Sequence, residues 1–243
     1  MRSALPIPLL AALALPAPAA PIVMYLSRPP FVLIGGNVTV SVTADLSMVE
    51  GTYDYKYVPR FDYGRQAQTV SFEFPAFVPS GTDSLQAFQD LTRFKLKVDD
   101  VDFSPVDTGR LNTTLGPPPK LMPSGTKVML AIFSVPRALL HERCILHVTY
   151  FQPPYRLAGQ PVAALFPLLP DFDRLKNELL FSRDDFSVTF SALGDIRLKR
   201  LSRNRAVGRE SPTLIEVHPV DRENIVVAVN PSAPSAAGPS TAR

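Results

Sequence analysis

Alternation of apolar and polar residues with a period of two constrains the fold of this chain more than any other feature. In Val38-Thr39-Val40-Ser41-Val42, the valines and the hydroxyl side chains fall on opposite faces of an extended strand. The same period recurs in residues 53–57, 70–74, 94–98 and 186–190. Residues 128–135, 144–151 and 225–229 are more continuously apolar, which is typical of strands covered on both faces. The pattern predicts a chain built from β-strands.

Turn residues separate these segments, and they favour an antiparallel arrangement. They include Gly35-Gly36, Pro79-Ser-Gly81, Pro153-Pro154 and Gly194-Asp195. The chain has 26 prolines, roughly twice the usual share of about 5%, and they limit register slip and edge pairing. We therefore expect an all-β fold, an antiparallel β-sandwich of the immunoglobulin-like or jelly-roll-like kind, with one or two short helices. Helical periodicity is best over 171–180 and weaker over 83–91.

The first nineteen residues have the order of a secretory signal peptide. Met1-Arg2 leads into an apolar run from Leu5 to Ala17 that closes on small residues. A membrane-spanning helix needs roughly 20 apolar residues, and the prolines in the run oppose both an anchoring helix and a first strand. We expect residues 1–19 to be removed after Ala19, leaving no transmembrane segment. The mature chain is then expected outside the cytoplasm, secreted or periplasmic.

The rest of the chain is expected to form one domain and a tail. Residues 22–229 have ample apolar residues for one core, although a Gly- and Pro-rich seam at 116–125 could divide two smaller sandwiches. Residues 230–243 are mostly Pro, Ser, Ala and Gly, a composition that predicts disorder. The single cysteine, Cys144, excludes an intramolecular disulfide and is expected to be a buried, inert thiol.

No arrangement of residues indicates catalysis. The histidines, His141, His147 and His218, lie in separate segments without zinc-ligand spacing. The aspartates cluster at 99–102, 171–173 and 184–185, where turn formation is a better explanation than calcium binding. The chain has no G-x-S-x-G elbow, phosphate loop or dinucleotide fingerprint. We therefore assign no catalytic or metal-binding residue and expect no cofactor, while a glycosidase using two carboxylates stays open.

A row of tyrosines is one candidate binding site. Tyr53, Tyr55 and Tyr57 project from one face of a strand, with Phe61 and Tyr63 just beyond. If that face is exposed, the rings could stack on sugars. If it is a core face, the tyrosine hydroxyls reach its rim. The polar partners Asp54 and Lys56 and the absence of tryptophan favour the core face.

A basic cluster is the other candidate. Residues 197–209 contain no acid and six bases, namely Arg197, Lys199, Arg200, Arg203, Arg205 and Arg209. Such a cluster suits an anionic polymer, a lipid head group or an acidic protein. The alternative is a solvated hairpin edge, where positive charge discourages aggregation. A formal net charge of only +3 gives no sign of nucleic-acid binding.

Absence of a catalytic signal favours an exported, non-enzymatic interaction or structural module. Its expected partner is envelope polysaccharide, an anionic surface or another exported protein. A carbohydrate-binding or carbohydrate-active secreted protein is the alternative, and transient attachment to anionic lipid through the arginines is a third hypothesis. Two sequons, at Asn37 and Asn112, matter only if the host glycosylates exported proteins.

Overall fold

A computed structural model describes residues 30–59, 67–110, 124–165, 186–202, 207–218 and 225–231. The predicted signal peptide, the helix expected over 171–180 and residues 232–243 lie outside these ranges. So do Phe61, Tyr63, Arg203 and Arg205, and the sequon at Asn112.

The largest of the three sheets in the described part of the chain has eight strands. Its order across the sheet is β13 (Val207–Glu210), β14 (Leu214–Val217), β11 (Phe186–Ala192), β1 (Phe31–Val42), β2 (Ser47–Tyr57), β8 (Arg143–Gln152), β4 (Lys95–Val98) and β5 (Val101–Phe103). Strands β1 and β11 pair in parallel, and the other neighbours in this sheet pair antiparallel.

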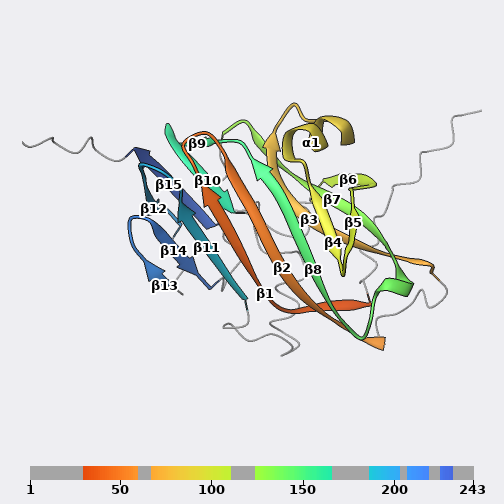
Figure 1. Cartoon of the computed structure of the whole chain (residues 1–243). Helices are drawn as coiled ribbons and strands as arrows, with labels where there is room; N and C mark the ends of the chain where they lie inside the picture. The colour runs from red at the N-terminus through yellow and green to blue at the C-terminus, as the bar shows by residue number, and fades with distance from the viewer. Residues whose placement is uncertain are drawn as a thin grey trace, which may run out of the picture.

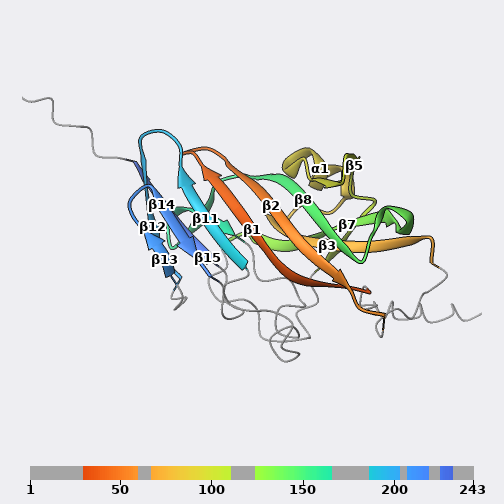
Figure 2. The same ribbon diagram turned by 60° about the horizontal axis from the view of Figure 1, so that its bottom comes forward.

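Two smaller sheets pack against the large one (Figure 1; Figure 2). One has the order β12 (Ile196–Arg200), β15 (Ile225–Pro231), β10 (Gln160–Leu165) and β9 (Tyr155–Leu157), and the other β3 (Thr69–Pro79), β7 (Thr126–Pro136) and β6 (Asp107–Arg110). One hydrophobic cluster contains buried side chains from all three sheets. The predicted all-β, mostly antiparallel sandwich is therefore confirmed.

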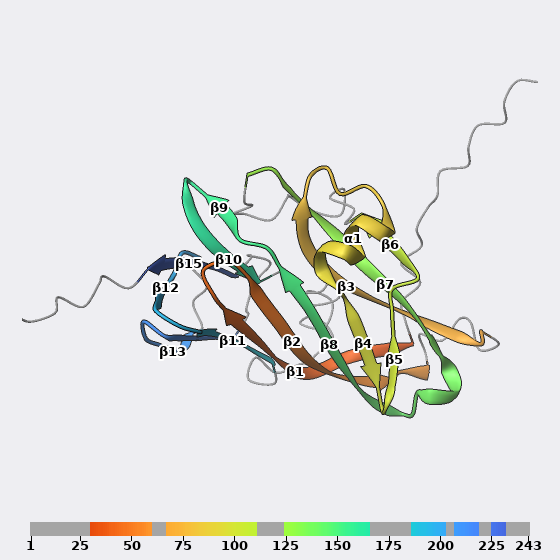
Figure 3. The same ribbon diagram turned by 45° about the horizontal axis from the view of Figure 1, so that its top comes forward.

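The helical part of the described chain is small. Helix α1 (Leu85–Thr92) begins after Ser84, whose Oγ accepts a hydrogen bond from the Ala87 amide at 3.1 Å. Figure 3 shows α1 near β3 and β6. Its buried Phe88 contacts Phe94, which stacks on Tyr150 of β8 with the ring centroids 4.2 Å apart. A further single turn, η3 (Arg137–Leu139), follows β7. The weaker of the two expected helices is thus present.

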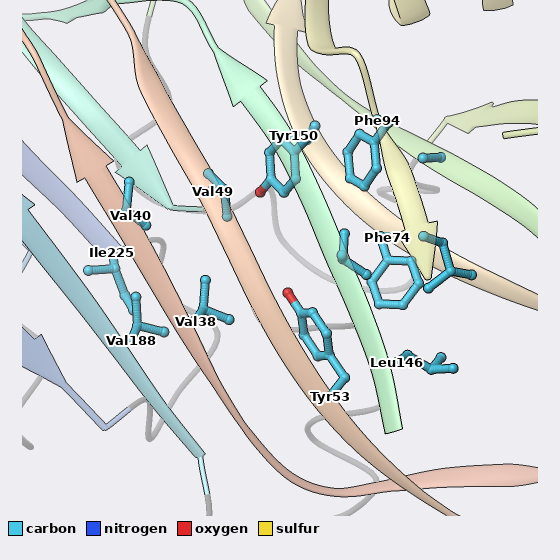
Figure 4. Close-up of a cluster of buried hydrophobic side chains, with 14 of the residues drawn as sticks. Val38, Val40, Val49, Tyr53, Phe74, Phe94, Leu146, Tyr150, Val188 and Ile225 are labelled. Carbon is cyan, nitrogen blue, oxygen red and sulfur yellow. The ribbon is translucent and has the colours of Figure 1, made fainter. Parts of the chain in front are cut away.

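The period-two segments form strands with their apolar residues in the core. Figure 4 shows Val38 and Val40 of β1, Val49 and Tyr53 of β2, and Val188 of β11 within it. The expectation that 144–151 is covered on both faces is wrong. In β8, Leu146 and Val148 are buried, but Ile145 is 47% exposed on the outer face of the large sheet.

Gly35-Gly36, expected as a turn, lies inside β1 at a bulge opposite β2. Gly36 has φ +154°, and a Cβ added there would overlap the Thr52 carbonyl oxygen. The bulge therefore needs glycine at this position.

Candidate functional site

The tyrosine row lies on the inner face of β2. Tyr53 and Tyr55 are only 8% and 7% exposed. The Tyr53 ring lies 5.1 Å from that of Phe74, and the Tyr55 ring lies 5.3 Å edge-on from that of Phe72. Both partners belong to β3 of the opposing sheet, and Figure 4 shows Tyr53 between the layers. Their ring faces contact protein, so they are not available to stack on a sugar.

Burial also determines the chemistry of Tyr53. Removal from water raises its pKa well above the ordinary value, and the nearby phenols of Tyr150 and Tyr55 add to the effect. The ring leans back along the strand over Gly51, where a Cβ would overlap it. Tyr53 is thus a neutral core residue that depends on a glycine for its position.

Tyr57 lies at the half-exposed end of the row, and another protein side chain occupies its ring face. The Arg137 guanidinium lies 5.5 Å from the ring centroid, and its Nη2 donates a hydrogen bond to the phenol oxygen at 3.2 Å. Phe31 packs with its centroid 5.5 Å away. All three tyrosines therefore have structural contacts.

The basic cluster is divided between two edge strands rather than carried by one hairpin. Strand β12 ends the four-stranded sheet, and β13 ends the eight-stranded sheet. On β12, the exposed Arg197 and Lys199 alternate with the buried Ile196 and Leu198. Neither basic side chain forms an ion pair within the described ranges. We call Arg197 and Lys199 the basic pair.

Arg200 has a different role from the basic pair. It lies on the inner side of β12, where its Nε is 3.5 Å from Oε2 of Glu210 on β13. Its Nη1 also donates a hydrogen bond to the Ser202 carbonyl oxygen at 2.9 Å. Arg200 therefore links the edges of the two layers and is not presented to a partner.

The outer backbone edge of β12 has a hydrogen bond within the chain at its centre. The Leu198 amide donates to the Pro212 carbonyl oxygen at 2.7 Å, in the turn between β13 and β14. An added strand would need that amide. At this point of β12, the side chains rather than the backbone are therefore open to a partner.

In the described part of the chain, two of the histidines contact structural partners. The Nδ1 of His218 lies 3.2 Å from the Phe186 carbonyl oxygen, and its Nε2 lies 3.7 Å from Oε1 of Glu216, so neither nitrogen faces a serine hydroxyl. The Nδ1 of His147 lies 3.2 Å from Oγ1 of Thr52 on the open face. Within the described ranges, no three His, Cys, Asp or Glu side chains gather as a metal site.

The aspartates at 99–102 and the cysteine have structural explanations, whereas the aspartate clusters at 171–173 and 184–185 lie outside the described residues. Asp99 and Asp100 form the tight turn between β4 and β5, where Asp99 has φ +51°. Lys97 pairs with Asp100 at 3.2 Å. Cys144 is buried, and desolvation, followed by the charges of Asp54 and Asp99, raises its pKa to about 12. Its thiol is therefore not a nucleophile at neutral pH.

Two exposed leucines were not anticipated from the sequence. Leu46 and Leu193 are 40% and 50% exposed, in turns that are far apart along the chain. The Leu193 amide donates to the Val42 carbonyl oxygen at 2.7 Å, which brings its turn beside the β1–β2 turn. Only the parallel pairing of β1 with β11 makes them neighbours, and no local pattern indicates that pairing.

Comparison with known proteins gives little guidance. No protein family model matches the chain, and no curated protein matches its sequence. Leukotriene A4 hydrolase from Saccharomyces cerevisiae is similar in structure over 83% of this chain and 29% of its own, with 6% identity and a TM-score of 0.39. The M1 zinc metallopeptidase from Deinococcus radiodurans is similar over 83% of this chain and 42% of its own, with 9% identity and a TM-score of 0.34. This chain thus spans less than half the length of either protein. Similarity at this level says nothing about its activity.

No helix in the described part of the chain combines the length and the apolar character needed to cross a bilayer.

Proposed function

We propose that this chain is an exported, non-enzymatic interaction module that contacts an anionic partner through the basic pair. The observation that carries the proposal is the exposure of Arg197 and Lys199, without an acidic partner among the described residues, on either side of Leu198, whose amide is already hydrogen-bonded within the chain. Such charges attract an anionic surface in a salt-dependent way. Arg209, exposed on β13, adds a third positive charge from the neighbouring edge strand.

Two further observations support this choice over the carbohydrate alternative. The tyrosines that would form a stacking platform are buried or covered by Arg137. The Nδ1 atoms of His147 and His218 lie 3.2 Å from Oγ1 of Thr52 and from the Phe186 carbonyl oxygen, so neither faces a catalytic nucleophile. Export is supported by the order of charge, apolar run and small residues in the first nineteen positions.

The test is retention of the purified chain on an immobilised polyanion such as heparin, measured over a series of salt concentrations. We expect R197E/K199E to elute at clearly lower salt than the wild type, with at least about tenfold weaker binding at low salt. The matched control is K56E/K97E, which changes the net charge equally at exposed positions of the large sheet.

The control separates a local contact from a general charge effect. If K56E/K97E weakens retention as much as R197E/K199E does, the basic pair is not the contact surface. If R197E/K199E binds like the wild type but aggregates more readily, the pair serves only to protect the sheet edge, and the proposal is wrong.

A further inference from the structure

Strand register gathers apolar side chains at one end of the outer face of the large sheet. In this row, Ser41 of β1 lies between Met48 of β2 on one side and Ser191 of β11 on the other. Met48 lies opposite Phe151 of β8, and Ser191 lies opposite Leu214 of β14. Leu46 and Leu193 lie two residues closer to the end than Met48 and Ser191, beyond the core-facing Ser47 and Ala192. We call this set the apolar end, and its members are Leu46, Met48, Phe151, Leu193 and Leu214.

The neighbouring row of the same face has no apolar residue. Moving inward by two residues along each strand, the register aligns only polar side chains, namely Glu216, Thr189, Thr39, Glu50, Thr149 and Lys95. Polar residues are usual on the open face of an antiparallel sheet. The apolar end departs from that rule, and its two most exposed members, Leu46 and Leu193, lie at the tip.

Charged residues lie beside one member of the apolar end and close in sequence to others. The exposed Arg93 places its guanidinium 6.0 Å from the centroid of the Phe151 ring. The basic pair begins at Arg197, four residues after Leu193. Two exposed acids, Asp45 and Asp195, lie in the same turns as the leucines and oppose this positive charge.

We propose that the apolar end docks on the surface of an anionic lipid bilayer, with Leu46 and Leu193 entering the interface and the basic pair near the head groups. This rests on the proposed function, because it identifies the anionic partner of the basic pair as lipid. A dissolved polyanion would neutralise Arg197 and Lys199 but would leave both leucines in water. A bilayer interface accommodates apolar side chains and attracts cations at the same surface.

The test is co-sedimentation of the full chain with vesicles of phosphatidylcholine alone or mixed with phosphatidylglycerol. We expect binding to the mixed vesicles and a reduction of about tenfold or more in L46S/L193S. The matched control is V101S/I145S, which removes apolar side chains of similar exposure, 43% and 47%, from elsewhere in the large sheet and should bind like the wild type. Circular dichroism checks that each variant is folded.

A gain-of-binding variant keeps the test independent of damage to the fold. D45N/D195N removes the two opposing charges, so binding to phosphatidylglycerol-containing vesicles should rise several-fold. In R197E/K199E, the preference for anionic over neutral vesicles should be lost.

Several results would overturn the inference. They are unchanged vesicle binding in L46S/L193S, an equal loss in V101S/I145S, or no vesicle binding by a wild-type chain that is still retained on heparin. The last result leaves the proposed function standing with a soluble polyanion as partner. Absence of binding to both vesicles and heparin overturns the inference and the proposed function together.

Discussion

At the scale of single residues, the contact between Gly51 and Tyr53 determines how the inner face of β2 packs. The Tyr53 ring occupies the space that a side chain at position 51 would need. It can then reach Phe74 and Phe186, with ring centroids 5.1 and 6.0 Å away. One glycine thus allows an aromatic contact between the layers.

We expect Gly51→Ala to destabilise the protein by about 1 to 3 kcal/mol, because the added Cβ forces the Tyr53 ring out of its position. The measurement is the urea midpoint of unfolding. Gly81→Ala is the control, since nothing lies within 4 Å of a Cβ added there, and it should change stability by less than about 1 kcal/mol. Equal effects of the two substitutions would contradict the packing argument.

The sequence predicts which side chains share a face of a strand, but it predicts poorly which of the two faces is exposed. The alternation placed Tyr53 and Tyr55 on one face, and the polar partners Asp54 and Lys56 favoured that face as the core. Alternation alone could not establish this, because the burial depends on β3, a separate strand of the opposing sheet. The same limit applies to Arg200. Its neighbours in sequence do not indicate that Glu210 of another sheet lies 3.5 Å away.

At the scale of elements, the free edge of β3 is protected where the two smaller sheets meet. Strand β3 pairs only with β7 among the described strands. The Tyr155 hydroxyl of β9 donates a hydrogen bond to the Phe77 carbonyl oxygen of β3, in a small cluster with Val162 and Val226. Pro75, which has no amide hydrogen, lies two residues earlier. The Tyr155 side chain thus makes a hydrogen bond to the edge of β3 that a neighbouring strand would otherwise make.

We expect Tyr155→Phe to destabilise the protein by about 1 to 3 kcal/mol, since it leaves a buried carbonyl oxygen without this donor. Thermal unfolding by circular dichroism measures the loss. Tyr57→Phe, which removes a hydroxyl from the half-exposed end of β2, should have a smaller effect. A larger loss at Tyr57 than at Tyr155 would show that the hydrogen bond to β3 is unimportant.

The long strands were predictable because their side chains alternate over many residues. The short strands, such as β9, β13 and β14, were missed, since three or four residues carry too little pattern. Pairing was not predictable either, because it depends on which apolar faces meet. For the same reason the apolar end, which only the register assembles, has no signature in the sequence.

At the scale of the whole molecule, strands from before and after residues 116–125 share the eight-stranded sheet. β4 and β5 precede this segment, and β8 pairs directly with β4. The main hydrophobic cluster likewise includes residues from both sides, such as Phe74 and Ile225. We therefore expect the described strands to unfold as one unit.

We expect the stability of this unit to fall as the pH rises above about 9. Burial raises the pKa of the Cys144 thiol from 9.0 to about 12, and it also raises the pKa of Tyr53 and Tyr150. These groups stay protonated when folded at a pH where the unfolded chain loses the protons. Their contribution is therefore complete below the unfolded pKa and is lost through the folded one.

Urea titrations at pH 7, 9, 10 and 11 measure this effect. Each tyrosine that is deprotonated in the unfolded chain but still protonated in the folded chain lowers the free energy of unfolding by about 1.4 kcal/mol per pH unit. Cys144→Ala should remove the earliest part of the fall, between about pH 9 and 10. A urea midpoint that stays constant up to pH 11 would contradict the burial of the Cys144 thiol and the tyrosine hydroxyls.

The parallel pair of β1 and β11 also affects the order in which the chain can fold. β1 is the first described strand to be synthesised, and β2 can pair with one of its edges almost at once. Its other edge must wait for β11, which follows most of the chain. Such distant pairing slows folding and leaves strand edges open to association with other chains. Until β11 has been made and paired, the second edge of β1 is therefore a point at which the new chain can associate with other chains.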